Sequence, residues 1–146
     1  MRISEVRITP IAVPDVPLVN TKGVHQKVFL RAVIEVVTDT GLIGLGEAYG
    51  AMRTLNGLTT VAPKLEGLDP YHLRDLRARV ETALPGAGGV NVPTALADHK
   101  VVDVVYSAFE IACLDLIGKH TDRPIYDLLG GAVRKDIPFG LSLIHI

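Results

Sequence analysis

The chain has 146 residues, 48% of them hydrophobic and 21% charged, with fifteen basic and sixteen acidic side chains. This composition fits one soluble globular domain. The charges are nearly balanced and form no runs of like sign, so nothing indicates a nucleic-acid or membrane surface, and we expect neither as a partner. No run approaches the ~18 apolar residues that span a bilayer, and the charged N-terminus does not resemble a signal peptide. The single cysteine fits a reducing compartment. We therefore expect a cytoplasmic protein.

The first half of the chain predicts three strands. Residues 3–13 are rich in β-branched side chains and contain Pro10, which favours an edge strand. Residues 28–38 alternate between apolar and more polar positions and form the clearest strand. A turn with Gly41 leads directly into a third run, 42–48, so that the two runs form a β-hairpin. An antiparallel three-stranded sheet with one polar face is expected.

The second half predicts helices over residues 52–66, 69–84, 101–119 and 125–129, with a loop rich in Gly, Pro and Ala at 85–100. Asp69 suits the N-cap, and Pro70 the first turn, of the second of these helices. The helix 101–119 is apolar around most of its circumference and should be buried on several sides. Strands followed by helices predict an α+β fold. A last apolar run begins at Ile137, and because the chain stops inside it, we expect a truncated second domain.

Common signatures of catalytic chemistry are missing from the sequence. The five histidines have no metal-ligand spacing. The glycines of residues 44–50 do not fit a phosphate-binding loop, because the spacing is wrong and they follow a hairpin strand. Cys113 lies in the apolar helix, where a small packing role is expected. Glu110 and Asp115 are five residues apart on that helix, so we expect capping or ion-pair roles instead of a catalytic pair.

Two polar side chains remain as candidates. His25 lies in a polar, glycine-containing loop at residues 20–25, and such loops commonly carry binding groups. The alternative is a solvated loop histidine. Glu47 follows the hairpin glycines in an apolar setting, where a structural hydrogen bond is favoured over a functional role, since buried carboxylates need partners.

Three stretches together resemble one superfamily: residues 107–119 (SAFEIACLDLIGK), 124–131 (PIYDLLGG) and 44–47 (GLGE). They are similar to the N-terminal cap of the enolase superfamily, in its mandelate racemase and muconate lactonising branch. The resemblance covers nearly the whole chain. It implies a capping domain over residues 1–135 and the start of a truncated barrel domain over 136–146.

Within that branch, residues 20–31 (NTKGVHQKVFLR) are similar to glucarate dehydratases. The resemblance implies that His25 contacts an acid sugar and that Thr94, in the loop before the long helix, plays a similar part. Family members also use a tyrosine on the first barrel strand. Residues 139–146 contain none, which leaves the last six residues as candidates for a non-native tail.

The resemblance further implies a carbon–oxygen lyase whose catalytic half is missing from this chain. Its Lys base, its His–Asp dyad and the carboxylates that bind Mg²⁺ belong to a C-terminal barrel. The implied reaction is proton abstraction next to a carboxylate, with the metal stabilising the enediolate and the β-hydroxyl leaving. The chain alone is therefore expected to be inactive, and the full-length protein to be a homo-oligomer acting on a small acid sugar. Alternatives are a cap of another acid-sugar dehydratase or a cycloisomerase, or a non-catalytic interaction module.

Overall fold

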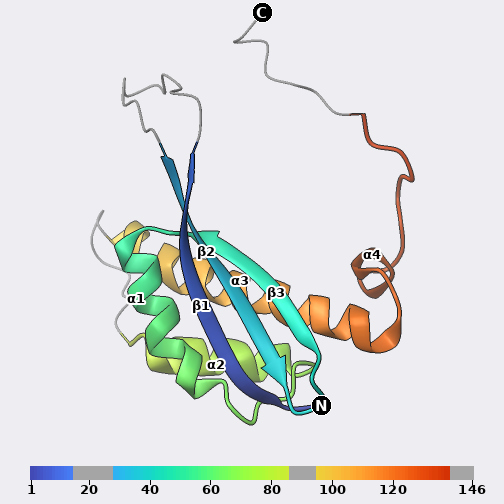
Figure 1. Cartoon of the computed structure of the whole chain (residues 1–146), viewed down its shortest axis with the longest axis horizontal. Coiled ribbons are helices and arrows are strands. Elements are labelled where there is room, and N and C mark those ends of the chain that lie inside the picture. The colour runs from blue at the N-terminus through green and yellow to red at the C-terminus, as the bar shows by residue number, and fades with distance from the viewer. Residues whose placement is uncertain (15–27, 86–94, 139–146) are drawn as a thin grey trace, which may run out of the picture.

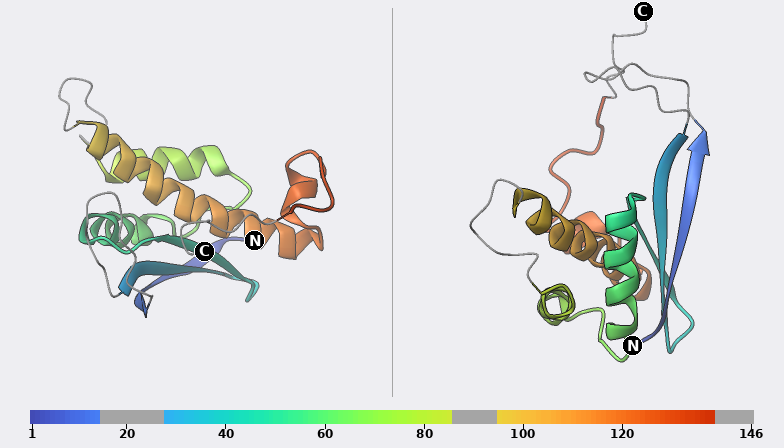
Figure 2. Two further views of the ribbon diagram at one scale, coloured as in Figure 1. Left: turned by 90° about the horizontal axis from the view of Figure 1, so that it is seen from above. Right: turned by 90° about the vertical axis from the view of Figure 1, so that its left-hand side faces the viewer.

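A three-stranded antiparallel sheet forms one layer of the protein, and helices cover one of its faces (Figures 1 and 2). The computed structural model describes the backbone of residues 1–14, 28–85 and 95–138, and the side chains of these residues except 95–100. The elements are β1 (Ile3–Pro14), β2 (Val28–Thr38), β3 (Ile43–Tyr49), α1 (Met52–Val61), the 3₁₀ turn η1 (Ala62–Lys64), α2 (Leu73–Ala83), α3 (Ala95–Thr121) and α4 (Ile125–Leu128). The predicted α+β class and the three strands are confirmed.

The strand order β1-β2-β3 places β1 at an edge, as Pro10 predicted. Leu30 accepts a hydrogen bond from the Gly50 N–H, so the even-numbered residues of β2 direct their backbone groups toward β3. Pro10 is paired with one of these residues, Ala32, and its nitrogen therefore faces away from β2. The missing N–H of proline thus costs the sheet no hydrogen bond.

The long helix α3 packs on the inner face of β3, where the side chains are unusually small. A Cβ atom added at Gly44 would lie 2.1 Å from the Ala112 carbonyl oxygen, and one at Gly46 would lie 2.2 Å from that of Ala108. Only glycine permits so close an approach of helix to strand. The buried apolar core lies between the sheet and helices α1 to α3, and its largest fully buried members are Phe109, Ile3, Ile34, Leu58, Leu65, Leu76 and Leu116.

Two predicted helix starts are wrong. The long helix begins at Ala95, six residues earlier than expected, because the Gly and Pro residues of the predicted loop end at Pro93 and residues 95–100 contain good helix formers. The second helix begins at Leu73. Asp69 instead closes a separate turn before it, in which the Asp69 carboxylate accepts the Tyr71 N–H at 3.1 Å.

The other two helical predictions hold with shorter bounds. The helix expected at 52–66 ends at Val61 and continues as η1, because Pro63 has no N–H to donate to the preceding turn. The short helix expected at 125–129 is α4. Of the strand expected from Ile137, only Ile137 and Pro138 are described, and they form no regular element. None of the described helices is long and apolar enough to cross a membrane.

Helix α3 ends in a strained residue that offers a test of the local geometry. Asp122 has φ +52°, and the next residue, Arg123, donates its N–H to the Gly118 carbonyl at 3.0 Å. This is the Schellman arrangement, whose left-handed position favours glycine. We expect Asp122→Gly to raise the free energy of unfolding by about 0.5–1 kcal/mol in urea titrations. Thr121→Gly, one residue earlier and helical, should lower it by a similar amount, and the same sign for both variants would contradict the assignment.

Candidate functional site

The two side chains predicted to contact substrate, His25 and Thr94, lie outside the described residues. The connections that carry them leave from ordered elements. Pro14 and Val28, which flank the first connection, are paired at the end of the β1–β2 ladder. Thr94 immediately precedes the first residue of α3.

The end of the sheet that carries the first connection is apolar and uncovered by the described helices. Strands β1 and β2 extend beyond the helical layer (Figure 1), and Ile11, Val13, Val28 and Leu30 there are exposed. Exposed apolar surface of this kind usually meets another protein surface. In the described part of the chain, nothing covers it.

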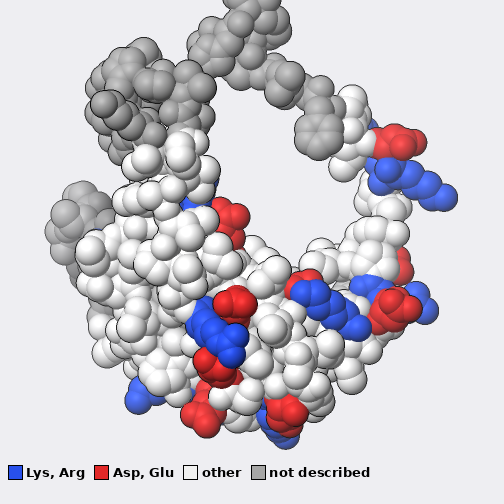
Figure 3. All heavy atoms as spheres, in the orientation of Figure 1, with Lys and Arg blue, Asp and Glu red and all other residues white. Residues whose placement is uncertain are grey.

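Charged side chains on the outer face of the sheet form ion pairs, one within β1 (Glu5 and Arg7) and one between β2 and β3. Arg31 of β2 lies 3.2 Å from Glu47 of β3 and 5.8 Å from the centre of the Tyr49 ring. The Glu47 side chain is 63% exposed, so the expectation of a carboxylate in an apolar setting is wrong. Alternation along β3 turns its odd-numbered residues outward, away from α3. Figure 3 shows blue and red patches side by side on this face, with no field of one sign.

A second charged cluster joins α2 to α3. Arg77 donates to Glu81 at 2.7 Å and to Asp103 at 2.8 Å, and it stacks 5.1 Å from the centre of the Tyr106 ring. These carboxylates raise the pKa of Arg77. Burial, and then the hydrogen bond to Glu110, raise the pKa of Tyr106 to about 12. Tyr106 is therefore protonated near neutral pH, and the Arg77–Asp103 contact of the cluster joins α2 to α3.

The remaining candidates from the sequence have structural roles. Glu110 accepts the Tyr106 hydroxyl at 2.8 Å, instead of the predicted cap or ion pair. Asp115 forms the predicted ion pair, with Lys119 at 2.6 Å. Cys113 is fully buried, and burial raises the pKa of its thiol to about 12, which agrees with a packing role.

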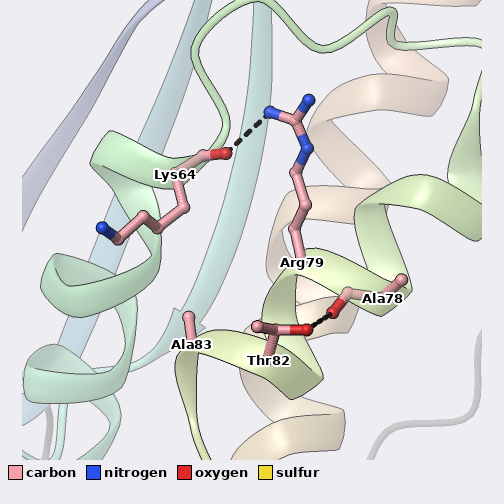
Figure 4. Close-up of a pocket in the computed structure, with 5 residues that line it drawn as sticks. All are labelled: Lys64, Ala78, Arg79, Thr82 and Ala83. Atoms are coloured by element: carbon pink, nitrogen blue, oxygen red, sulfur yellow. Dashed lines mark hydrogen bonds between the residues drawn. The ribbon is translucent and has the colours of Figure 1, made fainter.

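The pockets that lie away from the sheet include one beside η1 and one after α4. One, of about 520 Å³, lies between η1 and α2 and is lined by Lys64, Arg79, Thr82 and two alanines (Figure 4). The Arg79 guanidinium is already hydrogen-bonded within the protein, because its Nη1 donates to the carbonyls of Lys64 at 2.7 Å and Glu66 at 3.1 Å. The other, of about 890 Å³, follows α4 beside Val133, which is 98% exposed.

The described residues do not supply a metal site. Among them, no three His, Cys, Asp or Glu side chains lie close enough together to hold a metal ion. The described residues therefore provide a framework and an apolar surface. They do not provide a set of side chains that would bind the Mg²⁺ implied by the sequence resemblance.

Comparison with known proteins gives this arrangement a family. Residues 3–130 match the family described as "Mandelate racemase / muconate lactonizing enzyme, N-terminal domain". The chain is 37% identical, over 99% of its length, to a "Probable glucarate dehydratase" of Streptomyces coelicolor, and 32% identical, over 94%, to a "Cis-3-hydroxy-L-proline dehydratase" of Roseibium aggregatum. It covers 35% and 36% of these two relatives.

A solved structure shows the same fold. The enolase of Thermobispora bispora, crystallised with magnesium and formate, is 46% identical with a TM-score of 0.86, and the match covers 97% of this chain and 34% of the enolase. The chain thus spans about a third of the length of each of these three relatives.

Proposed function

Because this chain belongs to the mandelate racemase / muconate lactonizing enzyme family, whose N-terminal domain it matches, we propose that it caps the active site of an acid-sugar dehydratase acting on glucarate. The observation that carries the proposal is the 37% identity, over 99% of the chain, to the probable glucarate dehydratase of Streptomyces coelicolor. The similarity of residues 20–31 to glucarate dehydratases supports the same substrate.

In this proposal, residues 1–135 are the capping domain and residues 136–146 begin a barrel. The barrel supplies the base, the acid and the Mg²⁺ ligands, and the reaction removes a proton next to a carboxylate and then the β-hydroxyl. The part of this chain is to bind and orient the acid and to exclude water. His25 and Thr94 would provide the polar contacts, while the sheet and α3 hold the ends of their connections.

A second substrate has support from the comparisons. The relative from Roseibium aggregatum is named for cis-3-hydroxy-L-proline, at 32% identity over 94% of the chain. It is also a dehydratase, so the two candidates share a reaction type and differ in the polar groups that a cap would contact. Side-by-side kinetics with glucarate and cis-3-hydroxy-L-proline separate them.

The experiment fuses residues 1–135 to the barrel of the Streptomyces coelicolor relative and compares it with the same fusion carrying His25→Ala. Losing a hydrogen bond to a charged group costs about 1.5–3 kcal/mol, so kcat/KM for glucarate should fall roughly ten- to a hundredfold. The thermal melting temperature should not change, because a loop side chain contributes little to the core.

Three outcomes would contradict the proposal. These are unchanged kcat/KM in the His25→Ala fusion, a preference of the parent fusion for cis-3-hydroxy-L-proline over glucarate, and glucarate turnover by the 146-residue chain alone. The relative with its own cap serves as the control for a barrel that is correctly folded and loaded with magnesium.

A further inference from the structure

Strand β3 is an edge of the sheet, and its outer side carries backbone groups that β2 cannot bond. The Gly50 N–H donates to Leu30 and the Leu42 carbonyl accepts from Thr38, so even-numbered residues along this stretch face β2. The backbone N–H and C=O groups of the odd-numbered residues, including Ile43 and Leu45, therefore point away from β2, toward the free edge of the sheet. Such an edge is a template for pairing with another strand.

Two side chains of α3 occupy this edge. The Leu45 N–H donates to the Asp115 carboxylate at 2.8 Å, and the Lys119 ammonium donates to the Ile43 carbonyl at 2.7 Å. Asp115 and Lys119 are also bonded to each other at 2.6 Å, one helical turn apart, and their side chains are 28% and 42% exposed. Each partner of this ion pair therefore also forms a hydrogen bond with a backbone group of β3.

Together, the two side chains form the hydrogen bonds that one residue of a neighbouring strand would form with β3. In a parallel pair, a single residue donates its N–H to the carbonyl of residue i and accepts from the N–H of residue i+2. Here Lys119 provides the donor for Ile43 and Asp115 provides the acceptor for Leu45. The contact depends on the close approach of α3 to β3 that Gly44 and Gly46 allow.

We propose that Asp115 and Lys119 act as a side-chain substitute for a fourth strand, which closes the outer edge of β3 and prevents it from pairing with a second copy of the chain.

The opposite edge of the sheet, at β1, has protection of a different kind. There, Pro10 lacks an N–H on the outer side of β1, and Ile3 exchanges backbone hydrogen bonds with Gly67 and Leu68. Both edges of the sheet are thereby blocked along part of their length. This inference does not depend on the proposed substrate.

Amide hydrogen exchange of the 146-residue chain tests the hydrogen bond itself. In the wild-type chain the Leu45 amide should be protected although it lies on an edge, and Asp115→Ala should speed its exchange about 10- to 100-fold. The amides of Gly44 and Gly46, which face β2, should change much less. Asp115→Asn keeps an acceptor oxygen and should restore most of the protection.

Two results would overturn the assignment at this step. One is fast exchange of Leu45 in the wild-type chain. The other is an equal acceleration of all β3 amides in Asp115→Ala, which would indicate a general loss of stability instead of a local bond.

Sedimentation velocity tests the consequence for association. The double variant Asp115→Ala/Lys119→Ala should form more dimer than the wild-type chain at equal concentration, with new protection of the Glu47 amide in the dimer. The control is Arg77→Ala, which removes the charged contacts between α2 and α3 and touches no group of β3. Unchanged sedimentation of the double variant, or equal association of the Arg77→Ala control, would contradict a role in blocking the edge.

Discussion

Replacing Gly46 by valine is expected to abolish stable packing of α3 on the sheet. Already the first carbon of the new side chain would lie 2.2 Å from the Ala108 carbonyl oxygen and 3.3 Å from the Ala112 Cβ. The obstacle is helix backbone, which cannot rotate away, so the helix must move. Overpacking costs about 1–3 kcal/mol and occasionally more, and we expect a loss of about 3 kcal/mol or more in the free energy of unfolding. This is a large fraction of the 5–15 kcal/mol that typically stabilises a domain.

The measurement is a thermal melt followed by circular dichroism, in which Gly46→Val should lower the midpoint by roughly 10 °C or lose the cooperative transition. Glu47→Val is the matched control, since it places the same side chain on the same strand but on the exposed outer face. A Gly46→Val protein that melts like the Glu47→Val protein would show that α3 does not lie against β3 as closely as described.

Truncating Phe109 is the other change with a large expected effect. This side chain is fully buried and is the largest of the fully buried side chains of the core. Removing a buried aromatic ring leaves a cavity in addition to the lost burial, and Phe→Ala substitutions in cores typically cost about 3–5 kcal/mol. We therefore expect Phe109→Ala to reduce the free energy of unfolding by that amount in urea titrations.

A neighbouring residue of the same helix provides the comparison. Ile111 lies on the exposed flank of α3 and is 44% exposed. Ile111→Ala should cost less than about 1 kcal/mol, because little buried contact is lost. Equal losses for the two variants would mean that α3 presents a different face to the sheet.

The sequence alone determined those parts of the fold that depend on neighbouring residues. The bounds of β2 (Val28–Thr38) follow from alternating side chains, and the turn before β3 follows from a glycine, Gly41, which adopts φ +82°. Pro10 identified the edge strand through its missing N–H. In each case the signal is local, because side-chain alternation and backbone freedom act within a few residues.

The sequence by itself indicated only part of the candidate site: the polar loop at residues 20–25 made His25 a candidate, without a ligand. The resemblance to a known family added the acid-sugar contact of His25 and the choice of Thr94, and the described residues include neither side chain. Their chemistry could not be derived from spacing, since a substrate contact depends on groups brought together from distant parts of a polypeptide.

Only the tertiary structure decided the roles of Gly44, Gly46, Asp115 and Lys119. The two glycines suggest a phosphate loop at first sight, yet they are required because α3, more than sixty residues later, lies against them. Asp115 could be assigned an ion pair from its neighbours, but not its bond to the Leu45 N–H, 70 residues away in sequence. Contacts between distant segments arise from packing, and packing fixes which backbone groups remain open for a side chain to bond.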